Sequence, residues 1–191
     1  GRAYLGLLSV DPRSTLPKDP VRAVTLLREA AQGGYAHAYY FLAEVNLRGW
    51  NGAPDPALAL EDLSRGAMAG DAQCGISYAE KLLCEAGGQP DVARALEVLA
   101  SVAEGSSKAY AGQAHMILGE IHSRGQFVDP DYARADAHFE KGAVAMRAAH
   151  YERGRLRETG KLSGEPSPAL AAPCYEAGIA RDCDWAMAAM A

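Results

Sequence analysis

Small and large apolar residues recur at helical spacing along this chain, and the same pattern returns about every 36 residues. In each copy an alanine is followed four positions later by a large side chain, so both lie on one side of a helix. The alanines are Ala23, Ala59, Ala95, Ala135 and Ala171, and the large residues are Leu27, Leu63, Leu99, Phe139 and Tyr175. Successive alanines are 36, 36, 40 and 36 residues apart. The pattern predicts five helices that pack closely on their neighbours.

Residues that cap helices stand four positions before each of these alanines. They are Asp19, Asp55, Asp91, Asp131 and Ser167. Their side-chain oxygens can accept a hydrogen bond from an unpaired backbone N–H at the start of a helix. Proline follows three of them, at the position where its fixed φ suits the first turn. The five helices are therefore predicted to begin at these caps.

Another helix is predicted before each cap, with the order small, large, small and then glycine. The pattern is clearest in Ala38, Leu42, Ala43 and Gly49 and in Ala114, Leu118, Gly119 and Gly125. In the copy that begins at Ala72 the glycine is displaced to Gly87-Gly88, and the copy at Ala149 loses its leucine. Only Leu5-Gly6 remains of the first copy. Extra residues around 106–108 account for the single 40-residue spacing, and they amount to about one helical turn.

Helix pairs that repeat in this way bury their apolar faces by stacking on the next copy. The chain is therefore predicted to be all-α, with nine or ten helices in antiparallel pairs. The fold class is an α-solenoid that winds into a right-handed superhelix, as one domain over residues 1–191. The expected repeats are approximately 1–35, 36–71, 72–109, 110–147 and 148–183, and a further helix starts at 184–191.

The segment 184–191 is apolar and has no polar cap. It carries Trp185, Met187 and Met190, which an isolated terminal helix would expose. We therefore expect the chain to be a piece of a longer solenoid, or to self-associate through this helix.

The combined motif resembles the Sel-one-like repeat, a relative of the tetratricopeptide repeat. One copy of the motif reads Ala114, Leu118, Gly119, Gly125, Val128, Asp131, Arg134, Ala135 and Ala143, and another reads Ala38, Leu42, Ala43, Gly49, Asp55, Leu58, Ala59, Gly66 and Ala67. The tyrosine that the family carries in the first helix is replaced by Ser9, Asn46, Glu80, His122 and Arg157. The resemblance implies protein or peptide partners and favours a periplasmic or secreted setting in bacteria.

Composition excludes several classes of partner. The net charge is −5, and no run of lysine or arginine forms a stripe that would neutralise phosphates. Nucleic acid and anionic membranes are therefore not expected to bind. No apolar run approaches the roughly 20 residues that cross a bilayer.

The four cysteines do not form a metal or disulfide motif, because no two are spaced as C-x-x-C. Cys74 and Cys84 are ten residues apart, which is about 15 Å along a helix and too far for a disulfide. Cys174 and Cys183 lie across a predicted turn and leave two alternatives open, a disulfide in an oxidising compartment or two small buried residues.

The chain carries no recognisable catalytic, cofactor or metal motif. Its five histidines, His37, His115, His122, His138 and His150, do not form an H-E-x-x-H arrangement. His115 and His122 share a helix face near Glu120, but packed or exposed histidines are favoured over a metal site. The paired glycines lack the lysine and the serine or threonine of a phosphate loop. The protein is expected to be no enzyme and to bind no cofactor.

The expected functional surface is the side of each first helix that lies opposite its small and large packing residues. Such helices line the concave side of a solenoid, where partners usually bind. The predicted groove residues are Tyr40, Glu44, Arg48, Tyr78, Leu82, Met116, Glu120, Arg124, Tyr151 and Arg155. We expect Tyr40 and Arg124 to contribute to binding without contributing to packing. The alternative for Glu44–Arg48 and Glu120–Arg124 is a pair of ordinary ion pairs on a solvated face.

Two functions are compatible with this surface. The first is a scaffold that holds a protein or peptide in the groove. The resemblance to the repeat family implies a bacterial envelope, secretion or polysaccharide-export assembly as an example of its setting. The alternative is a structural spacer in a larger multidomain protein, with no ligand in the groove.

Overall fold

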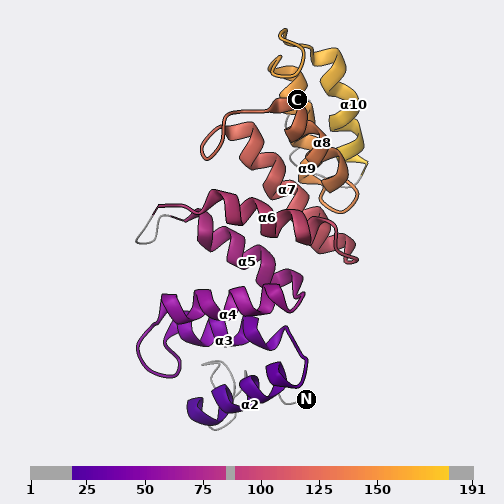
Figure 1. Ribbon diagram of the computed structural model, residues 1–191. Coiled ribbons are helices and arrows are strands. Elements are labelled where there is room, and N and C mark those ends of the chain that lie inside the picture. The colour runs from indigo at the N-terminus through magenta and orange to yellow at the C-terminus, as the bar shows by residue number, and fades with distance from the viewer. Residues whose placement is uncertain (1–18, 85–88, 181–191) are drawn as a thin grey trace. The chain divides into compact units, whose positions relative to one another are not determined.

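The structure is a computed structural model that describes residues 19–84 and 89–180 (Figure 1). In these two ranges all regular secondary structure is helical. The helices are α2 (Pro20–Gln32), α3 (Ala38–Arg48), α4 (Pro56–Met68), α5 (Ala72–Leu83), α6 (Val92–Ala103), α7 (Lys108–Arg124), α8 (Tyr132–Gly142), α9 (Ala148–Glu158) and α10 (Pro168–Ile179). The all-α, α-solenoid fold class is confirmed. The handedness of a superhelix stays a prediction.

Several expectations fall outside the described residues. They concern the first helix copy with Leu5, Gly6 and Ser9, the displaced Gly87-Gly88, the partner cysteine Cys183, and the terminal helix with Trp185, Met187 and Met190.

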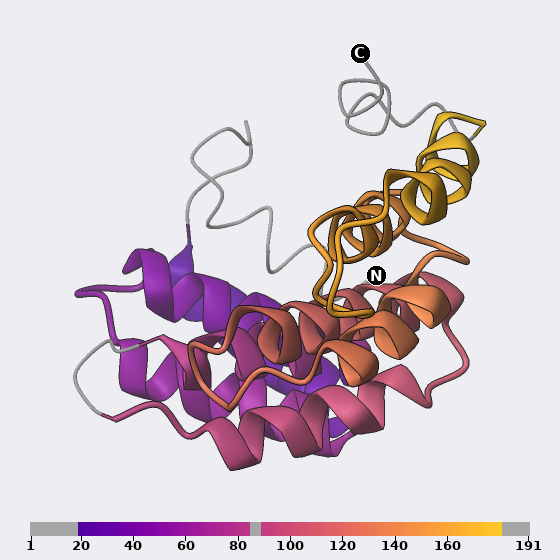
Figure 2. The same cartoon turned by 90° about the horizontal axis from the view of Figure 1, so that it is seen from above.

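The chain divides into two compact units, Gly1–Val98 and Leu99–Ala191, and the division falls within α6. In the first unit α2 packs on α3, α3 on α4, and α4 on α5. In the second unit α7 packs on α8, α8 on α9, and α9 on α10. Figure 1 shows α3 and α4 side by side, and Figure 2 shows the same helices from above. The proposed subdivision into five repeats stays a prediction.

The capping residues begin their helices as predicted, with one difference. Asp19, Asp55, Asp91 and Asp131 accept from the amide three residues later, at N···O distances of 2.9, 2.9, 3.0 and 2.9 Å. Ser167 makes no such side-chain bond. Its helix begins instead with Pro168 in the first turn and a backbone bond of 3.2 Å from Ala171 N to Ser167 O.

The predicted packing residues form the core of each unit. The five repeating alanines and the five large residues that follow them are each at most 4% exposed. The helix periodicity of the sequence therefore identifies the buried side of every second helix. The extra residues near 106–108 lengthen α7, which has 17 residues where α3 and α9 have 11. The inserted turn is thus absorbed at the start of a helix.

Small residues of the first helix lie with large residues of the second helix in three of the helix pairs, α3 with α4, α7 with α8, and α9 with α10. A Cβ added at Gly119 would lie 2.5 Å from Cε1 of Phe139, so α7 and α8 approach closely only because glycine stands there. Gly154 faces Tyr175 in the same way between α9 and α10. Between α3 and α4, Ala43 and Leu63 belong to one buried cluster. The two aromatic residues therefore face glycine, and the leucine lies with alanine.

Two of the polar residues that replace the family tyrosine form interhelical pairs. Asn46 Nδ2 on α3 donates to Asp62 Oδ2 on α4 at 2.8 Å, and both side chains are 5% exposed. Arg157 Nη1 on α9 donates to Asp136 Oδ1 on α8 at 2.7 Å. These polar contacts link helices at positions where the family places an aromatic ring.

Candidate partner-binding face

The ten predicted groove residues all lie on the first helices of the pairs. Tyr40, Glu44 and Arg48 belong to α3, Tyr78 and Leu82 to α5, Met116, Glu120 and Arg124 to α7, and Tyr151 and Arg155 to α9. Helices α3 and α5 contact each other in the first unit. Within that unit the structure therefore brings together residues from two successive first helices.

Arg48 is the exposed residue of this surface at the end of α3, and two contacts orient its side chain. Arg48 Nε donates to Glu44 Oε2 at 2.7 Å, and the arginine side chain is 59% exposed. Its guanidinium carbon also lies 5.2 Å from the ring centroid of Trp50, a cation–π arrangement. Trp50, in the turn after α3, adjoins this surface and was not among the predicted groove residues. The two contacts hold the Arg48 side chain in place and leave most of it accessible.

Tyr40 is more buried than the sequence indicated. Its ring packs against the buried cluster of Ala43, Ala59, Leu63 and Cys74. The expectation that Tyr40 makes no packing contribution is therefore wrong, because the close approach of α3 to α4 and α5 brings this side of the helix into contact with the core. Replacing Tyr40 by alanine would remove packing as well as surface.

An aromatic cluster fixes the position of Tyr40. Its ring stacks on His37 with 5.4 Å between centroids and an interplanar angle of 14°. Phe41 meets His37 edge-on at 4.9 Å. His37 Nδ1 lies 3.0 Å from Asp71 Oδ2, and Asp71 Oδ1 accepts from Cys74 N at 2.8 Å to cap α5. Sequence reasoning missed this cluster because His37 and Asp71 are far apart in the chain.

Tyr78 and Leu82 are half-buried on α5. Tyr78 packs against the same cluster as Tyr40. The pKa of Arg94 on α6 is raised, first by its hydrogen bond and charge interaction with Glu97 and then by a hydrogen bond with Tyr78. The carbonyl of Leu82 accepts from Asp91 N at 3.0 Å. Both α5 residues thus also position the start of the following helix.

Met116 is a correction to the predicted surface. It is 8% exposed and lies in the cluster with Ala135 and Phe139. Helix α7 buries two roughly opposite sides, one with Ala114 and Leu118 and one with Met116 and Gly119. The sequence pattern included Ala114, Leu118 and Gly119 but not Met116, so Met116 was placed wrongly on the exposed side.

Charged residues of α7 and α9 face each other in the second unit. Arg124 Nη2 lies 3.0 Å from Glu120 Oε2, and Arg155 Nη2 lies 2.9 Å from Glu152 Oε2. Burial raises the pKa of Glu120. The positive charges of Arg124 and Arg155 oppose this increase, whereas the negative charge of Glu152 adds to it. Glu152 and Arg155 belong to α9, so charges of α9 act on the carboxylate of Glu120 on α7. Glu152 is a member of this group that the sequence analysis did not name.

Tyr151 lies beside the charged residues of α9 and is half-buried. Its ring centroid is 5.9 Å from that of Tyr175 on α10, and it packs against the cluster of Ala171 and Tyr175. We define the first-helix face, separately in each unit, as the predicted residues without Met116, together with Trp50 in the first unit and Glu152 in the second. It combines half-buried aromatic rings with exposed arginines that are each paired to a glutamate.

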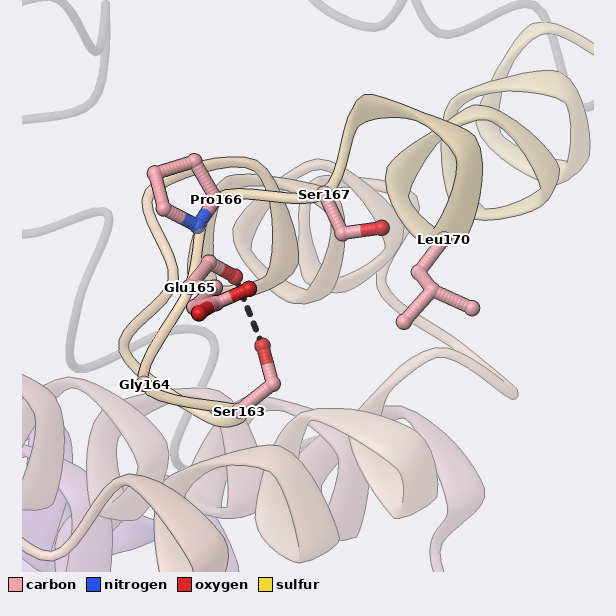
Figure 3. Close-up of a pocket in the computed structure, with 6 residues that line it drawn as sticks. All are labelled: Ser163, Gly164, Glu165, Pro166, Ser167 and Leu170. Carbon is pink, nitrogen blue, oxygen red and sulfur yellow. Dashed lines mark hydrogen bonds between the residues drawn. The ribbon is translucent and has the colours of Figure 1, made fainter.

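A separate hollow of about 590 Å³ lies in the loop between α9 and α10. It is lined by Ser163, Gly164, Glu165, Pro166, Ser167 and Leu170 (Figure 3). Ser163 Oγ donates to the carbonyl oxygen of Glu165 at 2.7 Å. None of the predicted groove residues lines it. All six residues come from one loop and the first turn of one helix, so the hollow follows from the local course of the chain.

The histidines that the sequence placed on one helix face have a third neighbour. His138 of α8 contacts both His115 and His122 of α7. In the part of the chain that the structure describes, no group of three or more histidine, cysteine or acidic side chains is arranged to hold a metal ion. Over the same residues, no helix is long and apolar enough to span a membrane.

Comparison with known families identifies the repeat. The family described as Sel1 repeat matches residues 3–35, 36–71 and 112–143. No curated protein matches the chain.

Solved structures of bacterial proteins are similar to the chain. A Sel1 repeat protein from Oxalobacter formigenes has a TM-score of 0.70 and 20% identity, covering 94% of this chain and 72% of that one. A putative Sel1 repeat protein from Klebsiella pneumoniae subsp. pneumoniae has a TM-score of 0.56 and 24% identity, covering 97% and 88%. The immunity protein Pa5087 from Pseudomonas aeruginosa has a TM-score of 0.50 and 19% identity, covering 96% and 66%. At these identities the similarity concerns the fold alone.

Proposed function

Because this chain belongs to the Sel1 repeat family, we propose that it is a scaffold that holds a protein or peptide partner on its first-helix face. Sel1 repeat proteins are generally scaffolds for protein interactions, and the family is typically non-enzymatic. The proposed binding residues are Tyr40, Glu44, Arg48, Tyr78, Leu82, Glu120, Arg124, Tyr151 and Arg155. The proposed setting is the envelope or a secretion or export assembly of a bacterium, as the resemblance to the family implies. The similar structures are bacterial proteins, which is consistent with a bacterial host.

The observation that carries the proposal is the recurrence of an ordered, exposed arginine one turn after a glutamate. Arg48 and Arg124 have side chains 59% and 60% exposed. An arginine that its own helix already orients loses less conformational freedom when it binds. Arginine and tyrosine are also the residues in which binding energy most often concentrates. The half-buried Tyr40, on the same helix as Arg48, and Tyr78 on α5 supply rigid apolar area.

The experiment compares variants of these arginines with a matched control. Arg65 on α4 is 54% exposed and forms the same i,i+4 pair, with Glu61, on a second helix. The immobilised wild-type protein, Arg48→Ala, Arg124→Ala and Arg65→Ala are each incubated with bacterial extract, and bound proteins are quantified by mass spectrometry. We expect one partner whose affinity falls by about fivefold or more in Arg48→Ala and Arg124→Ala, which corresponds to about 1 kcal/mol.

The control must retain the partner, and all three variants must melt within a few degrees of the wild type. Equal retention of the partner by all four proteins would place the contact outside the first-helix face. If no protein is enriched over a blank surface, a structural spacer is the better description.

A further inference from the structure

Three histidine rings meet between α7 and α8 in the second unit. His115 and His138 have ring centroids 5.3 Å apart, and His122 stacks on His138 at 5.8 Å with an interplanar angle of 6°. All three side chains are half-buried. Ala135 and Phe139, which flank His138 on α8, are fully buried. We call these three residues the histidine cluster.

The contact between His115 and His138 depends on their protonation. Their Nδ1 atoms are 3.1 Å apart, which is a hydrogen-bond distance. One nitrogen must then carry the proton while the other accepts it. If both rings are protonated, two N–H donors point at each other, so the bond is lost and two positive charges lie in contact. The observed geometry therefore requires that at least one of these rings is neutral.

The surroundings do not neutralise additional positive charge. The cations that act on the cluster are Lys141 and Arg134 of α8. Asp131, the carboxylate that acts on His122, already caps α8 at 2.9 Å and pairs with Arg134 Nε at 3.1 Å. On the other side of α8, the α9 arginines face Asp136 and Glu140. On α7, Glu120 is engaged with Arg124 and the charges of α9.

One member of the cluster, His122, also connects the two helices at the loop between them. The carbonyl of His122 accepts from Asp131 N at 2.9 Å, which ties the end of α7 to the start of α8. His122 occupies the position at which Asn46 pairs with Asp62 in the first unit. A change at the cluster therefore acts directly on the packing of α7 against α8.

We propose that the histidine cluster is a proton-sensitive latch, which holds α7 against α8 at neutral pH and loosens this helix pair in acid. The latch does not depend on the identity of any partner. Its consequence is that the part of the first-helix face on α7 changes when the surroundings become acidic.

The direction of the pH dependence follows from the proton affinities. Burial lowers the pKa of His138 to about 4, and the charges of His115 and His122, then those of Lys141 and Arg134, add to the decrease. Burial also lowers the pKa of His115 and of His122. The positive charge of Lys141 lowers that of His115 further, and the positive charge of Arg134 lowers that of His122 further. An unfolded histidine titrates near 6.5. The unfolded chain therefore takes up protons first, so this stability is complete above pH 6.5 and is lost as the pH falls towards 4.

A titration of the wild-type protein tests the latch without any substitution. The histidine ring resonances are followed by NMR from pH 8 to 4 after assignment. We expect His138 to titrate at least about one pH unit below the unfolded value, while His37, which pairs with Asp71 in the first unit, serves as a reference outside the cluster. Titration of all three cluster histidines at or above pH 6.5 would overturn the proposal.

Two further measurements test the consequences. The unfolding equilibrium constant should rise about 30-fold between pH 7.5 and 5 because of His138 alone. This part of the rise should disappear in His138→Gln and persist in the control His37→Gln. Hydrogen exchange, corrected for the intrinsic rate, should increase at pH 5 in peptides of α7 and α8 more than in peptides of α3 and α4. An equal increase in both units contradicts a latch in the second one.

Discussion

Asp62 offers the sharpest test of the packing between α3 and α4. Its carboxylate is 5% exposed and accepts from Asn46 Nδ2 at 2.8 Å. Burial raises its pKa from 3.8 to about 6, although Arg65, the hydrogen bond from Asn46 and Arg28 oppose the shift. Asp62→Asn removes the charge and keeps an oxygen that can accept from Asn46. We therefore expect the substitution to stabilise the protein at neutral pH.

The magnitude follows from the difference between the two pKa values. Because the folded state binds the Asp62 proton more tightly, stability falls as the pH rises through the range from 3.8 to about 6. The penalty on the charged form reaches about 3 kcal/mol at pH 7.5 and only about 1 kcal/mol at pH 4.5. Asp62→Asn should thus gain up to about 3 kcal/mol at pH 7.5 and about 2 kcal/mol less at pH 4.5.

Urea unfolding followed by circular dichroism measures both values. Wild type and variant are compared at each pH, so that the acid effect of the histidine cluster is common to both proteins and cancels. Asn46→Ala is a useful opposite control, because it leaves the buried carboxylate without its donor and should destabilise the protein. A loss of stability in Asp62→Asn that is equal at both pH values would refute the reasoning. The attraction of Arg65 and Arg28 would then outweigh the cost of burial.

Two further predictions concern packing. Leu63→Ala should lower the free energy of unfolding by about 2 to 5 kcal/mol, because removing a fully enclosed leucine leaves a cavity. Met68, on the same helix, is 79% exposed, so Met68→Ala should change the free energy of unfolding by no more than about 0.5 kcal/mol in the same urea assay. Gly119→Ala should cost about 1 to 3 kcal/mol because its Cβ overlaps Phe139. When Phe139→Leu is combined with Gly119→Ala, the double variant should lose less stability than the two single variants lose together. Strictly additive losses in thermal unfolding would argue against the close approach of Gly119 and Phe139.

The sequence was sufficient for the helices and their buried side because both depend on local spacing. Alanine and a large residue four positions later lie on the same face of any helix, so Ala59 and Leu63 were identified as core without knowledge of the neighbouring helix. The aspartate caps were predictable for the same reason, since their hydrogen bonds reach only three residues along the chain. Ser167 was predicted as a cap in the same way, but its side chain makes no cap bond, and its helix begins with Pro168 and a backbone bond.

The candidate site was only partly predictable because it depends on contacts between helices. Met116 is buried in a cluster with residues of α8 and α9, and the periodic pattern of α7 alone does not reveal that contact. The stacking of Tyr40 on His37, and the role of Asp71 in holding it, requires the register of α3 against α5. His138 was known as a residue, but its place between His115 and His122 requires the register of α7 against α8. Exposed ion pairs such as Glu44–Arg48 were predictable because both residues lie on one helix.

The matching of residue size across each helix pair limits how such chains can be rearranged. Glycine leaves room for an aromatic ring at Gly119, which faces Phe139, and at Gly154, which faces Tyr175. If α8 packed on α3 instead, the ring of Phe139 would overlap the side chain of Ala43. Duplication or recombination that breaks a pair between its two helices would therefore join parts that do not fit. Breakpoints that fall between pairs keep each small residue with its large partner, so the helix pair is the module that evolution or an engineer can move intact.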